Sequence, residues 1–288
     1  MLPRPEPLVD PNLDLLRPLH QIRKERNHHS FVAEGENTVR RLLQSPYPVA
    51  AIVCTPSHYE RLRDVMDAQR HHGTRCFVTE HRGLKSLVGF DFHRGCIALG
   101  PRPLPSVSLS PSTLATLQHV WKQRHSNGGR ALTVLFAEQL ADPANLGALF
   151  RNARAFGVDL VVVDSHGADP WSRRSIRASM GNVFHLDLVL SPDLPATLRS
   201  LTHNFHATAP FNILAATVGD RAQSLAKYSS QNHRGQSVAL LVGNEGSGLT
   251  KTILALADQE LTIPMESKAD SINVAAATAV LLYALSQR

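Results

Sequence analysis

The second half of the chain alternates strongly apolar, strand-like runs with helix-like segments, and this alternation constrains the fold more than any other feature. Runs such as Val238–Val242 are apolar throughout and lack the alternation of apolar and polar residues typical of a half-exposed strand. Strands of this kind are covered on both faces, as in parallel sheets flanked by helices. The sequence therefore predicts an α/β fold with a mostly parallel sheet.

The apolar periodicity places the elements of this half of the chain. Strands are expected at Ala131–Phe136, Leu160–Val163, Leu186–Leu190, Phe211–Ala216, Val238–Val242 and Leu261–Ile263. Helices are expected at Thr113–Lys122, Asn145–Phe156, Ser172–Met180, Leu194–Thr202, Leu249–Ala257 and Ile272–Ser286.

A smaller α/β unit is expected before residue 100, because strand-like and helix-like segments alternate there too. Its strands are predicted at Val49–Cys54, Arg75–Thr79 and Cys96–Leu99, and its helices at Glu36–Leu43, Ser57–Arg70 and Leu84–Val88. Residues 101–112 contain four prolines and four serines, which is typical of a linker. Residues 1–27 are rich in proline and charge and are expected to form a solvated tail or a short helix. The expected division is therefore a tail (1–27), a small domain (28–100), a linker (101–112) and a larger domain (113–288).

Charge and cysteine content narrow the class of protein. The 30 Lys+Arg and 24 Asp+Glu residues give a formal charge of +6, which suits an anionic partner such as nucleic acid, although many proteins this basic bind no polyanion. The three cysteines form no CxxC pair and the histidines no HExxH motif, so neither a disulfide framework nor a metal site is expected. The chain opens without a signal-like segment, and its longest apolar run, Val274–Leu285, is shorter than the ~20 residues that span a bilayer. We expect no membrane partner and a cytoplasmic location.

The first of three candidate functional segments runs from Asp142 to Gly157, where a strand is followed by a helix. Unpaired N–H groups and the helix dipole favour an anion at such a point, and Asp142 or Asn145 can cap the helix. Gly147 and Arg151 are four residues apart and share a helix face, so the small residue leaves room beside the long cationic one. A capped helix with a solvated arginine explains the same pattern.

A second segment, Ala239–Leu249, runs from a buried strand through a loop with glycines at 243, 246 and 248. Glycine lets backbone approach a ligand closely, which makes adenosine or phosphate binding plausible. The spacing is GxxGxG and differs from the GxGxxG dinucleotide fingerprint, which argues against a nicotinamide-dependent oxidoreductase. An ordinary tight turn remains an alternative.

A third segment, Leu261–Ala277, combines the last strand with the start of the last helix. Pro264 ends the strand because it cannot donate a ladder hydrogen bond, and Asp270 or Ser271 is expected to cap the helix. The helix is almost entirely apolar, which predicts burial in the core or at a subunit interface. Asn273 is its one early polar residue and is expected to act either as a cap or in a site.

Together the three segments resemble the SpoU (TrmH-type) family of RNA ribose methyltransferases, in the SPOUT class. The resemblance covers residues 131 to 288 and rests on Asn145-x-Gly147-xxx-Arg151, Gly243-Asn244-Glu245-Gly246-x-Gly248-Leu249, Ile263-Pro264-Met265 and Ser271-Ile272-Asn273-Val274. Residues 30 to 100 resemble, more loosely, the family's small substrate-binding domain, a ribosomal-protein-like α/β fold.

The resemblance implies an S-adenosylmethionine-dependent enzyme that methylates a ribose 2′-hydroxyl of rRNA or tRNA. It further implies a trefoil knot near the C-terminus and a homodimer formed through the knotted region. The alternative within the same fold is a catalytically inactive RNA-binding protein. The family usually has leucine where this chain has Ile272, a change that a backbone contact tolerates.

The resemblance also assigns roles to individual residues. The catalytic group is Arg151, Asn145, Glu245, Ser271 and Asn273, and the cofactor-binding group is Thr217, Gly243, Asn244, Gly248, Ile263, Met265 and Ile272. A guanidinium is a poor general base because its pKa exceeds ~12, so we expect Arg151 to orient a phosphate and stabilise developing oxyanion charge. The basic cluster of Arg173, Arg174 and Arg177 is expected either to bind RNA phosphates or to form a solvated helix face.

Overall fold

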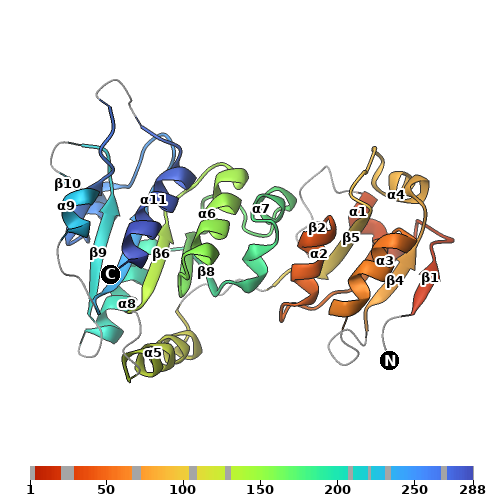
Figure 1. The fold of residues 1–288 in the computed structure, drawn as a ribbon, viewed down its shortest axis with the longest axis horizontal. Coiled ribbons are helices and arrows are strands. Elements are labelled where there is room, and N and C mark those ends of the chain that lie inside the picture. Colours follow the sequence, from red (N-terminus) through yellow and green to blue (C-terminus); the bar gives the residue numbers. More distant parts are fainter. Residues whose placement is uncertain are drawn as a thin grey trace. The chain divides into compact units, whose positions relative to one another are not determined.

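The computed structural model describes residues 4–20, 29–66, 73–103, 109–126, 131–206, 210–219, 222–230, 235–266 and 271–287. The chain divides into two compact units (Figure 1). The first unit consists of Met1–Leu104 together with Asp169–His185, and the second of Pro105–Ala168 together with Leu186–Arg288. The division between Leu104 and Pro105 falls inside the expected linker 101–112, whereas residues 169–185, expected in the larger domain, group with the first unit. Part of that linker, residues 104–108, lies outside the described residues.

The first unit contains, in its described part, a mixed five-stranded sheet with the order β1-β4-β3-β5-β2. Its strands are β1 (Pro5–Pro7), β2 (Ser30–Glu34), β3 (Ala51–Cys54), β4 (Arg75–Val78) and β5 (Cys96–Pro101). Its α-helices are α1 (Arg17–His20), α2 (Glu36–Leu43), α3 (Pro56–Leu62), α4 (His81–Val88) and α7 (Arg173–Ala178). The helix predicted at Ser57–Arg70 begins at Pro56, because Thr55 rather than Ser57 caps it, and ends at Leu62, where a 3-10 turn, Arg63–Val65, follows. Residues 67–70 lie outside the described residues.

The N-terminal segment, expected to be a solvated tail or a short helix, is packed on the first unit over its described part and contains the short helix α1. Strand β1 pairs in parallel with β4, and Leu16 and Leu19 are fully buried in the same core cluster as Phe77. The two leucines lie three residues apart across a 3-10 and α-helical turn, so both reach one face. The basic run Arg23–Arg26 lies outside the described residues.

Residues 169–185 join the first unit through aromatic packing. Trp171 lies 5.1 Å from the ring of Tyr47 and 5.8 Å from that of Phe31, and Phe184 lies 5.3 Å from Phe31 between ring centroids. The guanidinium of Arg173 pairs with the buried carboxylate of Glu34 on β2. These contacts are tertiary, so the local sequence pattern gives no sign of them.

The second unit is built, over its described residues, on an all-parallel seven-stranded sheet with the order β10-β12-β9-β11-β6-β7-β8. The strands are β6 (Thr133–Ala137), β7 (Leu160–Asp164), β8 (Leu188–Ser191), β9 (Phe211–Ala216), β10 (Gln223–Ser224), β11 (Ser237–Val242) and β12 (Gln259–Thr262). The helices are α5 (Pro111–Ser126), α6 (Pro143–Ala155), α8 (Leu194–Phe205), α9 (Leu225–Ser229), α10 (Lys251–Leu254) and α11 (Val274–Ser286). The predicted α/β class with a parallel sheet is confirmed.

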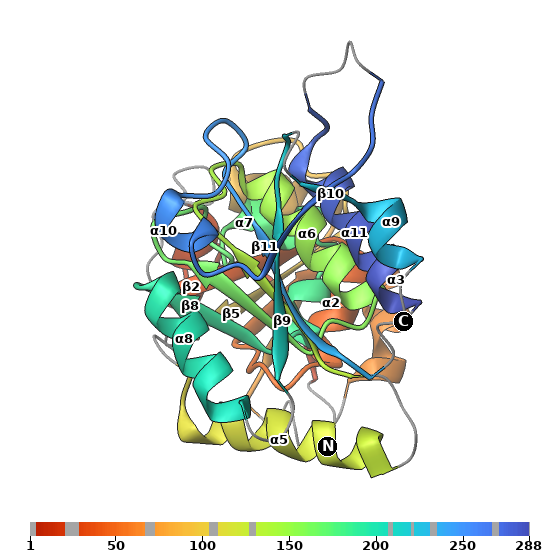
Figure 2. The same ribbon diagram turned by 90° about the vertical axis from the view of Figure 1, so that its left-hand side faces the viewer.

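Helices cover both faces of this sheet (Figure 2). On one face, Leu117 of α5, Leu198 of α8 and Ile253 of α10 share one apolar core with the strands. On the other face α6 packs along α11, which also contacts α9. Because all strands run the same way, their carboxyl ends lie at one edge of the sheet, and the three sequence segments meet there.

Helices α10 and α11 are shorter than predicted, and helix α9 and strand β10 were not predicted at all. Helix α10 ends at Leu254, well before the predicted Ala257, and the last helix begins at Val274 because Asn273 caps it. Within the part of the chain that the structure describes, no helix is long and apolar enough to cross a membrane.

Candidate functional site

A cavity of about 640 Å³ lies in the second unit, beyond the carboxyl ends of β9, β11 and β12. Its walls come from stretches that are distant in sequence, namely residues 216–218, 242–249, 261–263 and 271–274, together with Met265 and Asn145. The carboxyl edge of a parallel sheet is where such folds place ligands. All seven residues expected to bind a cofactor line this one cavity: Thr217, Gly243, Asn244, Gly248, Ile263, Met265 and Ile272.

The glycine loop between β11 and α10 folds back on itself. The backbone N–H of Asn244 donates to the carbonyl of Gly248 at 3.1 Å, and the N–H of Gly248 donates in return at 3.0 Å. Gly248 has a φ of +68°, and a Cβ on Gly243 would lie 2.4 Å from the carbonyl carbon of Gly248. Glycine is therefore required at both positions by backbone conformation and by space.

The side chain of Asn244 holds this loop from within and ties it to the neighbouring strand. Its Oδ1 accepts the backbone N–H groups of Gly246 at 2.8 Å and Ser247 at 3.1 Å. Its Nδ2 donates to the carbonyl of Gln139, just beyond β6, at 2.8 Å. Asn244 thus has a structural role in shaping the cavity wall in addition to lining it.

A hydrogen-bonded chain of three polar side chains joins the three sequence segments. Asn145 donates through Nδ2 to Glu245 Oε1 at 2.9 Å, and Asn273 donates through Nδ2 to Asn145 Oδ1 at 2.8 Å. Glu245 also accepts the backbone N–H groups of Ala141 at 3.0 Å and Asp142 at 3.3 Å. All three side chains line the cavity, so the fold brings together residues about a hundred positions apart in sequence.

The environment of Glu245 favours its charged form. Burial by itself would raise the pKa of this carboxyl, but hydrogen bonds from the Ala141 N–H and the Asn145 amide outweigh it. The pKa of Glu245 is therefore lowered, because donors aimed at a carboxylate stabilise the ionised form.

Asn273 combines the two roles that the sequence left open. Its Oδ1 caps α11 by accepting the N–H groups of Ala275 at 2.8 Å and Ala276 at 3.3 Å, while its Nδ2 bonds Asn145. The predicted cap at Asp270 or Ser271 is therefore wrong for Ser271, and Asp270 lies outside the described residues. Ser271 instead lines the cavity with an exposed side chain.

Thr217, directly after β9, fixes the part of the cavity wall at the carboxyl end of that strand. Its backbone N–H donates to the carbonyl of Leu261 at 3.0 Å, and its hydroxyl donates to Glu260 Oε2 at 3.0 Å. These bonds join the ends of β9 and β12, so Thr217 and Ile263 form adjoining parts of the cavity wall.

Arg151 is the one predicted catalytic residue that does not line the cavity. It lies on α6, whose N-terminus is capped by Asp142 through a 2.9 Å bond from the N–H of Ala144. The Arg151 side chain is exposed and, among the described residues, makes no hydrogen bond or ion pair. Its guanidinium is therefore available to a ligand or to another chain.

The predicted RNA-binding arginines belong to the first unit and are not equivalent. Arg173 is half-buried, pairs with Glu34 and lies over the ring of Phe90 at 5.2 Å, so it stabilises the unit. Arg174 and Arg177 are exposed.

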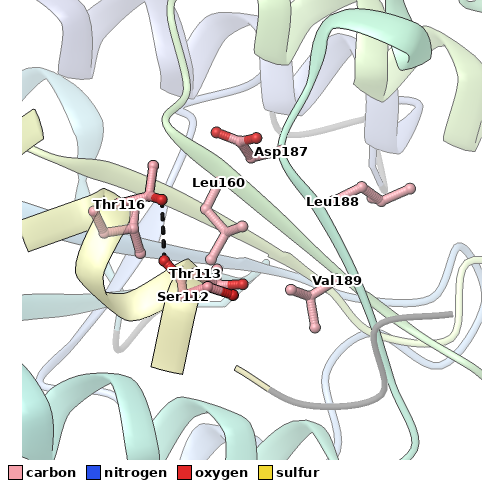
Figure 3. Close-up of a pocket in the computed structure, with 8 residues that line it drawn as sticks. Ser112, Thr113, Thr116, Leu160, Asp187, Leu188 and Val189 are labelled. Carbon is pink, nitrogen blue, oxygen red and sulfur yellow. Dashed lines mark hydrogen bonds between the residues drawn. The ribbon is translucent and has the colours of Figure 1, made fainter. Parts of the chain in front are cut away.

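A second, smaller cavity of about 190 Å³ lies between α5 and the strands β7 and β8 (Figure 3). Leu160 and Val189 line it, and the Thr116 hydroxyl on its wall donates to the Ser112 carbonyl at 3.0 Å. Burial and the nearby Asp159 raise the pKa of Asp187 at its rim. No residue predicted to act in catalysis or binding lies there, so the larger cavity is the candidate site.

Sequence reasoning missed Glu138 and Thr250, which bond to each other beside the glycine loop. The only signal was an acidic residue directly after an apolar strand. Residue spacing could not show that its partner lies more than a hundred positions away.

Comparisons with known proteins show which family and which relatives this chain resembles. Residues 132–283 match the model of the SpoU rRNA Methylase family. The chain is 32% identical over 280 residues to an uncharacterized tRNA/rRNA methyltransferase of Mycobacterium tuberculosis, covering 95% of this chain and 88% of the relative. It is 27% identical over 267 residues to the 23S rRNA (guanosine(2553)-2′-O)-methyltransferase of Bacillus subtilis, covering 93% of this chain and 92% of the relative.

The fold is also similar to a solved structure. The SpoU methyltransferase AviRb of Streptomyces viridochromogenes, in complex with the cofactor AdoMet, superposes with a TM-score of 0.70. The match covers 95% of this chain and 96% of that chain at 21% identity, so it concerns the fold.

Proposed function

The chain belongs to the SpoU rRNA methylase family, and from that membership we propose how its residues carry out methyl transfer to a ribose 2′-hydroxyl of rRNA or tRNA. It is an S-adenosylmethionine-dependent RNA 2′-O-methyltransferase. The observation that carries the residue assignments is the meeting of three distant sequence segments around one cavity of about 640 Å³.

The cavity has the size and lining that this cofactor needs. Small-molecule sites commonly measure ~300–1,000 Å³ and combine apolar walls with a few polar groups. Here Ile263, Met265 and Leu249 offer apolar surface, and the glycine loop exposes backbone to a ligand. We assign the backbone of Gly243, Ile263 and Ile272 to the adenosine, with Thr217, Asn244, Gly248 and Met265 completing the pocket.

The cofactor supplies an activated methyl group, and the chain's own residues supply position and charge. The Glu245–Asn145–Asn273 chain holds the rim of the cavity rigid, which keeps the reacting oxygen in line with the methyl group. Ser271 and Asn273 hydrogen-bond the 2′-hydroxyl or the methionine end of the cofactor. Arg151 stays protonated, orients an RNA phosphate and stabilises the developing oxyanion while the hydroxyl proton passes to solvent water.

We assign the functional unit as a homodimer in which Arg151 of one subunit completes the cavity of the other. The exposed Arg151 supports this, since it lies outside the cavity of its own chain. Apolar residues exposed on α11 also support it: Val280 is 42% and Tyr283 59% exposed, and Tyr283 packs edge-on to Phe156 of α6. Covering such a face is a common reason for association.

The homodimer can be tested by complementation. We expect Arg151→Ala and Asn273→Ala each to inactivate the enzyme, whereas a mixed dimer would contain one intact composite site. Co-expression should restore up to about half of the wild-type activity per mixed dimer, because that site has Arg151 from one chain and Asn273 from the other. Mixtures that stay inactive, or a monomer by light scattering, contradict the shared site.

Two further features of the family resemblance complete the proposal. We assign the first unit to RNA binding, with the exposed Arg174 and Arg177 as phosphate contacts, and the cytoplasm as the site of action because the RNA substrates occur there. We also assign a trefoil knot to the C-terminal region, an exceptional topology in proteins. A crystal structure in which the path of the backbone contains no knot would contradict this assignment.

In the decisive experiment, purified protein and S-adenosylmethionine are incubated with rRNA in one reaction and with tRNA in another. Both RNAs lack modifications. We expect one 2′-O-methylated nucleoside, found by mass spectrometry after digestion, in one of the two RNA classes. Methyl groups on a base contradict the reaction type. Binding of S-adenosylhomocysteine by calorimetry without any RNA methylation favours the inactive RNA-binding alternative, and binding of NAD in its place favours an oxidoreductase.

A further inference from the structure

Glu138 is a buried carboxylate that the reaction described above does not use. It directly follows β6 and is 4% exposed. Its Oε2 accepts the backbone N–H of Thr250 at 2.8 Å, and its Oε1 accepts the Thr250 hydroxyl at 2.7 Å. Among the described residues it has no cationic partner.

Folding alone gives little reason for a carboxylate at this position. A buried charge is costly unless several donors satisfy it, and an apolar side chain of similar size is often as stable or more so. Here two donors of one residue, the N–H and the hydroxyl of Thr250, satisfy the two carboxylate oxygens. We therefore look for the role of Glu138 in its binding partner, Thr250.

Thr250 marks the far end of the glycine loop. It is the N-cap of α10 and directly follows Leu249, the last of the loop residues that line the cavity. The near end of the loop is Val242, whose carbonyl accepts the backbone N–H of Glu138 at 2.9 Å. One residue thus holds both ends of the loop, through its backbone at Val242 and through its side chain at Thr250.

Everything between these two anchors belongs to the cavity wall, since residues 243–249 all line it. The middle of the loop is held separately, by Asn244 on the Gln139 carbonyl and by Glu245 on the N-terminus of α6. The Glu138–Thr250 pair supplies the anchor at the end where the loop enters α10. Without it the loop would have to be ordered by the ligand, at a cost in affinity.

We propose that Glu138 is a positioning residue for the cofactor, in which its carboxylate, by binding the N–H and hydroxyl of Thr250, fixes the glycine loop 243–249 in the shape that binds S-adenosylmethionine. This inference rests on the proposed function of the cavity. Loss of the Glu138 carboxylate should therefore weaken cofactor binding and leave kcat nearly unchanged, because Glu138 does not line the cavity.

The test compares truncation of two carboxylates: Glu138, directly after β6, and Asp159, which precedes β7 and bonds the first residue of β6. Glu138→Ala should raise the Kd for S-adenosylhomocysteine, measured by calorimetry, at least tenfold and raise KM for the cofactor in parallel. At saturating cofactor its kcat should stay within threefold of the wild type. Asp159→Ala removes the carboxylate whose Oδ2 accepts the Thr133 N–H at 2.8 Å, far from the cavity, and should leave that Kd unchanged.

A milder series keeps the inference testable if Glu138→Ala fails to fold. Thr250→Val removes the hydroxyl donor and keeps the N–H, and should raise the Kd three- to tenfold. Thr250→Ser retains the hydroxyl and should bind as the wild type does. Loss of thermal stability in Thr250→Val with an unchanged Kd would mean that the pair serves folding alone.

The outcomes also distinguish this inference from the proposed function. If the wild type binds S-adenosylhomocysteine and the folded Glu138→Ala or Thr250→Val protein binds it equally well, the inference is wrong and the proposed function stands. If Asp159→Ala weakens binding as much as Glu138→Ala, the effect is general and the inference is again wrong. If the wild type itself does not bind the probe, the proposed function fails first.

Discussion

Replacing Gly243 by alanine is the sharpest perturbation that the cavity wall allows. The added Cβ would lie 2.4 Å from the Gly248 carbonyl carbon, 2.4 Å from the Leu249 nitrogen and 2.5 Å from the Gly248 oxygen. All three are backbone atoms, so no side-chain rotation can relieve the contact. The two ends of the loop must separate instead, which breaks the paired hydrogen bonds between Asn244 and Gly248.

The size of the effect follows from the cost of overpacking, which is typically ~1–3 kcal/mol. For a domain of ~150–250 residues, each kcal/mol lowers Tm by about 2–4 °C, so we expect a fall of about 2–12 °C. If the loop opens to relieve the strain and must close again on the ligand, the same ~1–3 kcal/mol raises the Kd about 5- to 150-fold.

The same loop provides a matched control in Gly246. A Cβ there would lie 3.5 Å from Asn244 Oδ1, an ordinary contact, and the Gly246 φ is not in the left-handed region. Calorimetry with S-adenosylhomocysteine and thermal unfolding should therefore show a Gly246→Ala protein with an unchanged or slightly higher Tm. A Gly243→Ala protein as stable and as tightly binding as the wild type would refute the reasoning, as would equal loss of stability in both variants.

Three further predictions concern other parts of the molecule. Arg151→Ala should abolish RNA methylation and leave calorimetric S-adenosylhomocysteine binding within about twofold, because its side chain lies outside the cavity of its own chain; wild-type methylation by this variant contradicts the assignment. The folded-state pKa of Glu245 is lowered, so its ionised carboxylate should stabilise the folded cavity wall fully above the unfolded pKa of ~4.3. This stabilisation should be lost as pH falls through the folded-state pKa. Cofactor affinity measured from pH 7 to 3 should follow that course, and Glu245→Gln should lack this acid dependence. Burial raises the pKa of Cys96 to about 12, so this thiol should not react with iodoacetamide at pH 8 until the protein is unfolded, and native labelling at Cys96 by mass spectrometry contradicts its burial.

Local elements could be predicted where the sequence pattern itself determines them. The helix Glu36–Leu43 and the strand Phe211–Ala216 were predicted with the bounds that the structure has. The helix has Val39, Leu42 and Leu43 on one buried face and basic residues in its last turn, as helices favour. The strand is a short, mostly apolar run. The α/β class and the family were likewise confirmed, because each rests on repeated or combined local motifs.

Elements that depend on distant partners could not be predicted. Strand β1, Pro5–Pro7, exists because it pairs with β4, and its proline-rich sequence reads as a tail. Residues 169–185 join the first unit through Trp171 and Phe184, whose aromatic contacts lie more than a hundred positions away in sequence. Short-range propensity gives no information about such packing.

The candidate site shows the same division. The seven residues predicted to bind the cofactor line one cavity, but the sequence did not show how the polar side chains around it are hydrogen-bonded. The chain Glu245–Asn145–Asn273 links positions 100 and 128 residues apart, and the dual role of Asn273 as helix cap and bonding partner follows only from the folded geometry. In the proposed homodimer Arg151 completes the cavity of the partner subunit, an arrangement that neither local pattern nor the fold of one chain determines.

The most direct test of the account is a crystal structure of the protein soaked with S-adenosylhomocysteine. We predict ligand density in the cavity of about 640 Å³, with the adenosine between the backbones of Gly243, Ile263 and Ile272. Density at any other place, or an empty cavity in crystals soaked at saturating concentration, would contradict the central claim.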